Sequence, residues 1–341
     1  MRHLDFSGGR IELTHGGGGR ATTQLVEELF LPAFDNPLLA TRNDSASFEA
    51  PGVHLVMSTD SFVVSPLFFP GGDIGSLAVH GTVNDVAMAG ARPLYLTAGF
   101  ILEEGLPLAD LRRAVRSMAA AAAAAGVRII AGDTKVVERG KGDGIFVTTT
   151  GIGVRAADVT PSADRARPGD AVLVSGTLGD HGIAILSQRE GVGFETNVRS
   201  DSAALHELTA AIVAACPAVH VLRDPTRGGL AAALNEIAAA SRVGVMLDEA
   251  AIPVAPEVAA ACELLGLDPL HIANEGKLVA IVPVEDANCV LAAMRADPLG
   301  QNASRIGTVT EDAGRFVQLR GTFGGARILD WLSGEQLPRI C

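Results

Sequence analysis

The strongest structural pattern in the chain lies in residues 58–93, STDSFVVSPLFFPGGDIGSLAVHGTVNDVAMAGARP. An apolar strand over 53–58 enters this block and ends at Thr59 and Asp60. Apolar residues at helical spacing then predict a helix over 73–89, and a second strand is expected over 93–100. A strand, a helix and a strand in this order indicate a helix packed on a sheet.

The next segments extend the same pattern. The sequence predicts a long Ala-rich helix over 110–125 and strands over 127–131 and 144–154. The resulting order, β-α-β-α-β-β, predicts an α+β domain with its helices on one face of a small sheet.

A second domain is predicted after a polar linker, TPSADRARPG, at residues 160–169. We expect strands over 171–175, 243–247 and 277–282, helices over 230–241, 257–265 and 287–296, and a closing hairpin over 306–309 and 316–319. The predicted division is a Gly-rich N-terminal segment (1–40), a first domain (41–159), a second domain (168–320) and a tail (321–341).

The charge of the chain limits its partners. Its 341 residues include 27 Lys and Arg and 39 Asp and Glu, a net charge of −12, so no cationic field is expected to attract nucleic acid. No segment is long and apolar enough to predict a membrane span. The four cysteines form no CxxC or CxxH pair, which argues against a disulfide framework or a structural zinc site. We therefore expect a cytoplasmic protein.

A Gly-rich loop, HGGGGR at residues 15–20, is one candidate anion site. The backbone of Gly16, Gly17, Gly18 and Gly19 can approach a phosphate closely, and its consecutive N–H groups can form an anion nest. The loop matches neither GxxxxGK[ST] nor GxGxxG, so a flexible N-terminal loop is an equal alternative.

A candidate metal site consists of four aspartates, Asp44, Asp60, Asp85 and Asp133. Asp60 ends an apolar strand, Asp85 interrupts the apolar face of a helix, and Asp133 follows the expected strand 127–131. Mg²⁺ takes oxygen ligands and is commonly shared between carboxylates and nucleotide phosphates. Each aspartate alone is compatible with a turn or cap. As a set beside a glycine loop and Lys135, they favour a metal–nucleotide site.

The second domain offers a further anion site in RDPTRGGL, residues 223–230, before a helix. Thr226 can cap the helix, while Gly228 and Gly229 expose N–H groups at its start. Arg227 favours an anion, and an ordinary Asp-Pro turn is the alternative. Glu275, in NEGK before an apolar strand, is either a general base or a solvated turn residue.

The last residue, Cys341, follows Pro338, which disfavours a helix. An extended tail of ~20 residues after Arg320 spans ~60 Å. Such a tail could carry the thiol into a distant pocket and out again. The alternative is a surface cysteine on a frayed chain end.

These motifs together resemble a known family over essentially the whole chain. HGGGGR, the 58–93 block, AGDTKVV, RDPTRGGLA, NEGKL and the ending PRIC resemble the HypE hydrogenase maturation proteins, which are carbamoyl dehydratases. That family belongs to the superfamily of aminoimidazole ribonucleotide synthetase and selenophosphate synthetase. The ending PRIC is typical of HypE within it.

The resemblance implies a two-domain PurM-like architecture. The first domain would be α+β, of ferredoxin-like type, forming a homodimer through its sheet; the second would be α/β, followed by a mobile, extended tail. ATP and Mg²⁺ would lie near the sheet ends and between the domains.

The resemblance also implies a reaction on Cys341. The carbamoyltransferase HypF would load this thiol with a carbamoyl group, and ATP-dependent dehydration would turn the S-carboxamide into a thiocyanate. The cyano group would then pass to the HypC–HypD complex and become an iron ligand of [NiFe] hydrogenase.

Roles for individual residues follow from the same resemblance. Glu275 would be the base that removes the N–H protons, and Lys135 would orient the thiocarbamate or stabilise phosphoryl oxygens. The four aspartates would take the metal positions. The implied nucleotide contacts are Gly16 to Gly19, Thr59, Asp60, Asn84, Asp85, Asp133, Thr134, Asp224, Thr226, Arg227, Gly228 and Gly229.

Two other functions are compatible with these motifs. A sibling enzyme, such as a selenophosphate synthetase or a small-molecule kinase, would share the ATP site and would not need Cys341. A non-catalytic carrier would present the tail thiol to partners and would have no use for the aspartates and Lys135.

Overall fold

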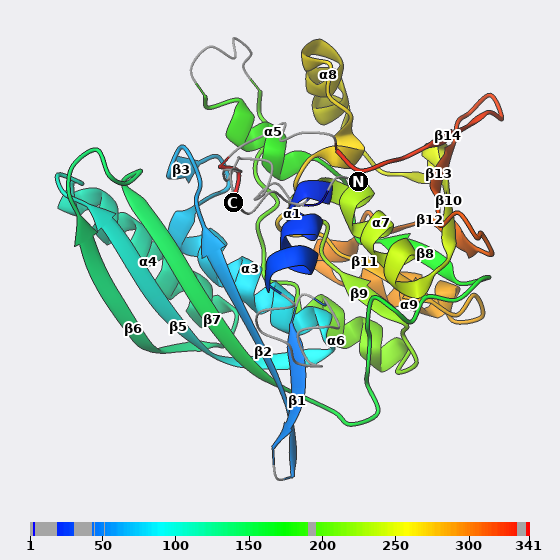
Figure 1. Cartoon of the computed structure of the whole chain (residues 1–341), viewed down its shortest axis with the longest axis horizontal. Coiled ribbons are helices and arrows are strands. Elements are labelled where there is room, and N and C mark those ends of the chain that lie inside the picture. Colours follow the sequence, from blue (N-terminus) through cyan, green and yellow to red (C-terminus); the bar gives the residue numbers. More distant parts are fainter. Residues whose placement is uncertain are drawn as a thin grey trace.

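The structure is a computed structural model that describes residues 3, 19–30, 43, 45–50, 52–189, 196–332 and 339–341. Of the expected phosphate loop, Gly16, Gly17 and Gly18 lie outside these residues, as does Asp44. Two sheets form the two halves of the molecule, and the C-terminal residues lie between them (Figure 1).

The first sheet has the strand order β1-β2-β7-β5-β6. Neighbouring strands are antiparallel except β5 and β6, which are parallel. Its strands are β1 (Ala46–Ala50), β2 (Val53–Phe62), β5 (Ala91–Glu103), β6 (Arg128–Val137) and β7 (Ile145–Arg155). The short strands β3 (Phe68–Phe69) and β4 (Gly72–Asp73) pair with each other in a separate sheet.

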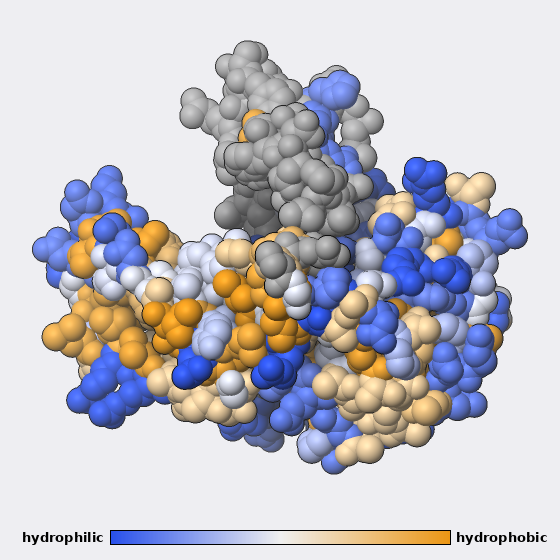
Figure 2. All heavy atoms as spheres, turned by 90° about the horizontal axis from the view of Figure 1, so that it is seen from below, coloured by the Kyte–Doolittle hydropathy of each residue, from blue (hydrophilic) through white to orange (hydrophobic). Residues whose placement is uncertain are grey.

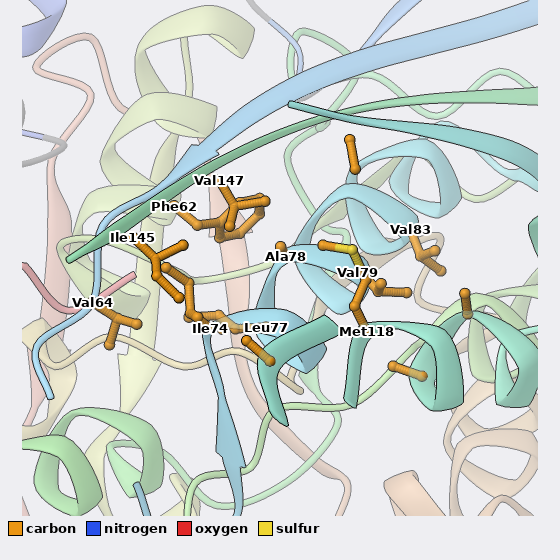
Figure 3. Close-up of a cluster of buried hydrophobic side chains, with 14 of the residues drawn as sticks. Phe62, Val64, Ile74, Leu77, Ala78, Val79, Val83, Met118, Ile145 and Val147 are labelled. Atoms are coloured by element: carbon orange, nitrogen blue, oxygen red, sulfur yellow. The ribbon is translucent and has the colours of Figure 1, made fainter. Parts of the chain in front are cut away.

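Two helices, α3 (Ile74–Met88) and α4 (Leu108–Ala124), cover one face of this sheet. Asp73 begins α3 because its carboxylate accepts from the backbone N–H groups of Gly75 and Ser76. Figure 3 shows the core between helices and sheet, where Phe62 and Val147 from the strands meet Leu77 and Met118 from the helices. The predicted helices over 73–89 and 110–125 are confirmed.

The second sheet has the order β14-β13-β10-β12-β8-β11-β9, and its core strands are buried on both faces. Its strands are β8 (Ala171–Val174), β9 (Val221–Arg223), β10 (Gly244–Asp248), β11 (Val279–Val282), β12 (Ser304–Thr310), β13 (Val317–Arg320) and β14 (Ala326–Ile328). Helix α7 (Gly229–Ser241) packs on one face, and α6 (His206–Ala215) and α9 (Ala287–Ala296) pack on the other.

Shorter elements complete the chain. They are α1 (Arg20–Leu25), a π-helical turn (Val26–Phe30), α5 (Asp180–Leu186), α8 (Pro256–Leu265) and single 3₁₀ turns at Glu249–Ala251, Pro269–His271 and Pro298–Gly300. The expected linker lies between β7 and β8, while β14 lies past the expected end of the second domain at residue 320. The domain boundaries themselves stay a prediction.

The predicted closing hairpin is wrong. β12 pairs antiparallel with β10, placing Val309 opposite Val245, and β13 pairs with the other edge of β10, in parallel, placing Val317 opposite the same residue. β10 therefore separates the two strands. The reason is that β10 is largely buried, with Val245 and Leu247 only 1% exposed, so its backbone N–H and C=O groups need partner strands on both edges.

Asp133 also lies differently from the prediction. The sequence predicts a strand over 127–131, with Asp133 following its end. β6 instead runs on to Val137 and pairs with β5 along this extension, so Asp133, opposite Gly99, lies within an edge strand.

The surface of the first-sheet half is partly hydrophobic. Strongly hydrophobic residues gather over the left and middle of the view in Figure 2, the side that carries the first sheet. Ile130 and Val136 on β6 are 61% and 66% exposed. Among the described residues, no helix combines the length and apolar character needed to cross a membrane.

Candidate active site

The last three residues of the chain are docked between the two halves of the molecule, beside α5 in Figure 1. The Val63 N–H donates to the Cys341 carbonyl at 3.0 Å, and the Ser65 N–H donates to the Arg339 carbonyl at 3.1 Å. The Ile340 side chain is 4% exposed and joins the core of the first sheet. The tail tip thus lies along the chain that leaves β2.

Three charged side chains surround the Cys341 thiol. Burial raises the pKa of this thiol, the Arg227 guanidinium partly lowers it, and the Glu275 and Asp60 carboxylates raise it again. In turn, Cys341 is the main cause of the raised pKa of Arg227. The thiol is therefore held protonated beside a carboxyl group and a cation.

Glu275 is a buried carboxyl, 3% exposed, and its Oε1 has no hydrogen-bond partner among the described residues. Burial raises its pKa well above the usual range, and the nearby Asp224, Asp201 and Asp60 raise it further against the opposing effect of Arg227. A buried carboxylate with a raised pKa binds protons readily, which suits a general base.

The backbone around Glu275 is fixed from both sides. Its N–H donates to Asp201 Oδ1 at 3.0 Å, and its carbonyl accepts from Asn84 Nδ2 at 3.4 Å and from the Ala203 N–H at 3.3 Å. The next residue is Gly276, where a Cβ would lie 1.8 Å from the Asp201 carbonyl oxygen. Only glycine lets the two backbones approach this closely, which explains why a glycine follows Glu275.

A polar cavity of about 190 Å³ adjoins this cluster and shares Asp60 and Arg227 with it. Asp85 lies beside Asp60 and accepts from Ser58 Oγ at 2.6 Å. The other lining residues are Arg223, Asp224, Thr226, Gly229, Ala232, Ala233 and Glu236.

The start of helix α7 faces the cavity. Gly228 and Gly229 have φ angles of 79° and 62°, a left-handed conformation that favours glycine, and a Cβ on Gly229 would lie 2.6 Å from the Leu270 carbonyl oxygen. The glycines therefore turn the chain sharply into the helix. Its first N–H groups and Arg227 suit an anionic phosphate.

Carboxylate oxygens at the same cavity fit a hard cation. Asp60, Asp85 and Asp224 supply the oxygen ligands that Mg²⁺ prefers. Within the described part of the chain, no three His, Cys, Asp or Glu residues are grouped closely enough to hold a metal by themselves. A metal here would therefore need phosphate oxygens and water to complete its coordination.

The structure does not bring the β6 residues Asp133, Thr134 and Lys135 to this cavity. Strands β7 and β5 separate β6 from β2, which carries Asp60. Lys135 Nζ lies 3.3 Å from Asp133 Oδ2, and both side chains are more than 70% exposed.

Two further predicted contacts have other surroundings. Asn84 is 1% exposed, and its amide bonds to the backbone of Ala203, Leu205 and Glu275, so it joins the two halves of the molecule. Thr59 lies on β2 and bonds to Thr149 and Thr150 of the neighbouring strand. Gly19 precedes α1 as its N-cap.

Sequence reasoning missed the residues that hold the tail tip and Glu275. These are His181, Arg189 and Asp201. Asp201 lies in a segment without regular structure, and no motif marks any of the three. Each acts through the backbone of a distant residue, which leaves no local pattern to detect.

Comparison with known proteins identifies the family. The N-terminal domain of AIR synthase related protein matches residues 42–155, and the C-terminal domain of the same family matches residues 167–320. Carbamoyl dehydratase HypE of Cupriavidus necator is 66% identical over the whole of this chain and 97% of its own length. The chain belongs to the HypE family.

Solved structures of HypE proteins have the same fold. A HypE chain in a HypE–HypF complex is 49% identical, covers 90% of this chain and 99% of its own length, and superposes with a TM-score of 0.86. A hydrogenase maturation protein HypE in complex with ATP is 54% identical, covers 97% of this chain and 100% of its own length, with a TM-score of 0.82.

Proposed function

We propose that this chain is an ATP-dependent carbamoyl dehydratase of [NiFe] hydrogenase maturation that acts on its own Cys341. The observation that carries the proposal is the docked position of Cys341 beside Arg227, Glu275 and Asp60. A partly buried thiol next to a proton acceptor and an anion-binding cavity suits an attached group that is both phosphorylated and deprotonated.

The reaction begins with an S-carboxamide on Cys341. Its oxygen attacks the γ-phosphate of ATP, forming a C–O–P linkage and releasing ADP. Both N–H protons must then leave the nitrogen. The first is released to give a neutral phosphorylated imidate, and Glu275 takes the second as the C–O bond breaks, so phosphate leaves and S–C≡N remains on Cys341. The carbonyl oxygen departs as phosphate because a free oxide is a far poorer leaving group.

The cavity residues supply binding and charge. Asp60, Asp85 and Asp224 would hold Mg²⁺ together with phosphate oxygens, and Arg227 and the start of α7 would bind the phosphates. Mg²⁺, when bound, would neutralise charge that develops on the transferred phosphoryl group. The related HypE structure in complex with ATP supports nucleotide binding by this family.

Lys135 requires a second copy of the chain in this proposal. It lies on β6, which pairs only with β5 within the described residues and is exposed over residues 128–136. An exposed edge strand with apolar side chains is a natural pairing surface. We therefore place Lys135, with Asp133 and Thr134, at a homodimer interface formed through the first sheet.

The partners of the reaction follow from the family. HypF would supply the carbamoyl group, which the known HypE–HypF complex supports, and the HypC–HypD complex would receive the cyano group. The docked tip must leave the site for both exchanges.

Intact-mass spectrometry of the full chain with HypF, carbamoyl phosphate and ATP tests the proposal. The wild-type chain should gain the mass of one carbamoyl group and then lose the mass of one water in a step that needs ATP. The variant Cys341→Ala should do neither. An adduct that never dehydrates would indicate a carrier, and ATP turnover of a free substrate by Cys341→Ala would indicate a selenophosphate-synthetase-like enzyme.

A further inference from the structure

We propose that His181 is a positioning residue that holds the tail tip, residues 339–341, so that Cys341 stays aligned with the active site. The role in catalysis rests on the proposed dehydratase function, whereas the docking of the tip does not. His181 lies on α5 in the second half of the molecule, and the tip also contacts the first half.

The His181 ring is fully buried and bonded at both nitrogens. Its Nε2 lies 2.8 Å from the Ile340 carbonyl oxygen, and its Nδ1 lies 2.8 Å from Ser200 Oγ. A carbonyl can only accept, so Nε2 carries the proton and Nδ1 accepts from the Ser200 hydroxyl. The Phe69 ring packs against the imidazole at 5.6 Å and 89°. The donor is thereby aimed at one carbonyl.

Three further contacts also go to the backbone of the tip, while the Arg339 side chain bonds to Asp143. Val63 and Ser65 donate to the carbonyls of Cys341 and Arg339, and Arg189 donates to the Arg339 carbonyl at 2.9 Å. We call these four residues, Val63, Ser65, His181 and Arg189, the tail socket. The buried Ile340 side chain provides the apolar anchor.

The tail socket therefore recognises the tip without bonding to the sulfur of Cys341. The same socket can hold Cys341 as a free thiol, an S-carboxamide or a thiocyanate, because each form leaves the backbone unchanged. A carrier residue that passes through several chemical states needs this kind of recognition.

His181 has a particular place in the socket. It holds the carbonyl of the peptide bond that leads directly into Cys341, and it does so from the same half of the molecule as Glu275. Losing this hydrogen bond would let the peptide rotate and move the reacting group away from Glu275. Small displacements of a reacting group lower rates strongly.

Alkylation of Cys341 by iodoacetamide tests the docking in the absence of ATP and HypF. Peptide mass spectrometry would compare wild type with His181→Phe, which removes the donor, and with His181→Gln, which retains an N–H near the position of Nε2. We expect about fivefold faster labelling of Cys341 in His181→Phe, the size of effect expected for one hydrogen bond, and a rate near wild type in His181→Gln. Cys289 is exposed and should label equally in all three chains.

Two more variants keep the docking test decisive. Ser200→Ala removes the partner of Nδ1, together with the acceptor of the Ser202 N–H, and leaves the His181 donor in place. It should give a smaller increase, and it replaces His181→Phe if that chain fails to fold. Ser187 lies at the end of the same helix, where its hydroxyl donates to the Ala184 carbonyl oxygen. The control variant Ser187→Ala should leave the labelling rate of Cys341 unchanged. The proposal would be overturned if folded His181→Phe labelled Cys341 at the wild-type rate. If His181→Phe does not fold, the same result in Ser200→Ala would overturn it.

A single-turnover measurement tests positioning. With the carbamoyl group already on Cys341, His181→Phe should dehydrate more slowly at saturating ATP, with unaltered ATP affinity, and His181→Gln should recover the rate. Equal losses in both variants, with weaker ATP binding, would indicate a general structural role and contradict the proposal. If the wild-type chain never dehydrates, the proposed function fails, and labelling still reports the docking.

Discussion

Glu275 is the single residue whose surroundings most clearly set its chemistry. Burial and three neighbouring aspartates favour its neutral form, while Arg227 favours its charged form. The same Arg227 interacts electrostatically with Cys341 and Asp60, so one guanidinium acts on the whole cluster. Replacing any member of such a cluster shifts the proton affinity of the others.

The rate of dehydration should therefore depend on pH through Glu275. A base works only when deprotonated, and the pKa of Glu275 is raised, so the rate should increase with pH over a range above that of an ordinary carboxyl group. Asp224→Asn removes one charge that raises this pKa and should move the rise to lower pH. The measurement is single-turnover dehydration of carbamoylated enzyme at saturating ATP across pH.

Two controls make the pH prediction specific. Glu257→Gln removes an exposed carboxylate on α8 and should leave the profile in place. Glu275→Gln should lower the rate by about 10²-fold or more, the usual effect of losing a general base. A profile that Asp224→Asn leaves unmoved would assign the ionisation to another group.

The sequence predicted the residues of this cluster that take part in the chemistry, but not the residues that hold them in place. The residue types alone left Glu275 open between a base and a turn residue, and the family resemblance was needed to choose a role. Asp201 and His181 escaped both kinds of reasoning. Each bonds to the backbone of a residue more than 70 positions away, and such contacts depend on the fold and not on local spacing.

Between elements, the packing of α3 against α4 depends on one missing side chain. A Cβ on Gly75 would lie 2.0 Å from the Ala114 carbonyl oxygen, so the two helices touch through their backbones at this point. Neither backbone can yield without separating the helices. Gly75 therefore determines how closely α4 covers α3 and the sheet beneath them.

Gly75→Ala should lower the free energy of unfolding by ~1–3 kcal/mol, the usual cost of overpacking a core. The gain in helix propensity from replacing glycine, below ~1 kcal/mol, offsets only part of this cost. Urea unfolding measures the change. Gly325→Ala is the matched control, because a Cβ there meets nothing within 4 Å and should alter stability by less than ~0.5 kcal/mol. Equal midpoints for the two variants would contradict the close helix contact.

Local patterns predicted most helices and strands but not their partners. The apolar spacing located α4 and α9 well, because each buries one periodic face. α3 and α7 were also located, although both are buried on nearly all sides. Strand order is a non-local property, so β12 and β13 looked like a hairpin although β10 lies between them. β9 and β14, at three residues each, were too short to give a recognisable pattern.

In the molecule as a whole, the three predicted catalytic residues and the predicted nucleotide contact Arg227 occupy two separate places. Cys341, Glu275 and Arg227 lie between the two halves, while Lys135 lies on the free edge of the first sheet. One chain therefore holds an incomplete set if all four residues serve the same reaction. A homodimer through β6 would complete each site with Lys135 from the partner.

Mixing two inactive variants tests this arrangement. Lys135→Ala and Cys341→Ala should each fail to form thiocyanate alone. After the two chains are unfolded and refolded together, a mixed dimer would pair the intact Cys341 of one chain with the intact Lys135 of the other, restoring one site in two. Equal mixing makes about half of the dimers mixed, so the yield should approach one quarter of wild type.

Co-refolding Lys135→Ala with the double variant Lys135→Ala, Cys341→Ala is the control and should restore nothing. Activity that never returns in a mixture shown to contain mixed dimers would mean that Lys135 does not act across the interface.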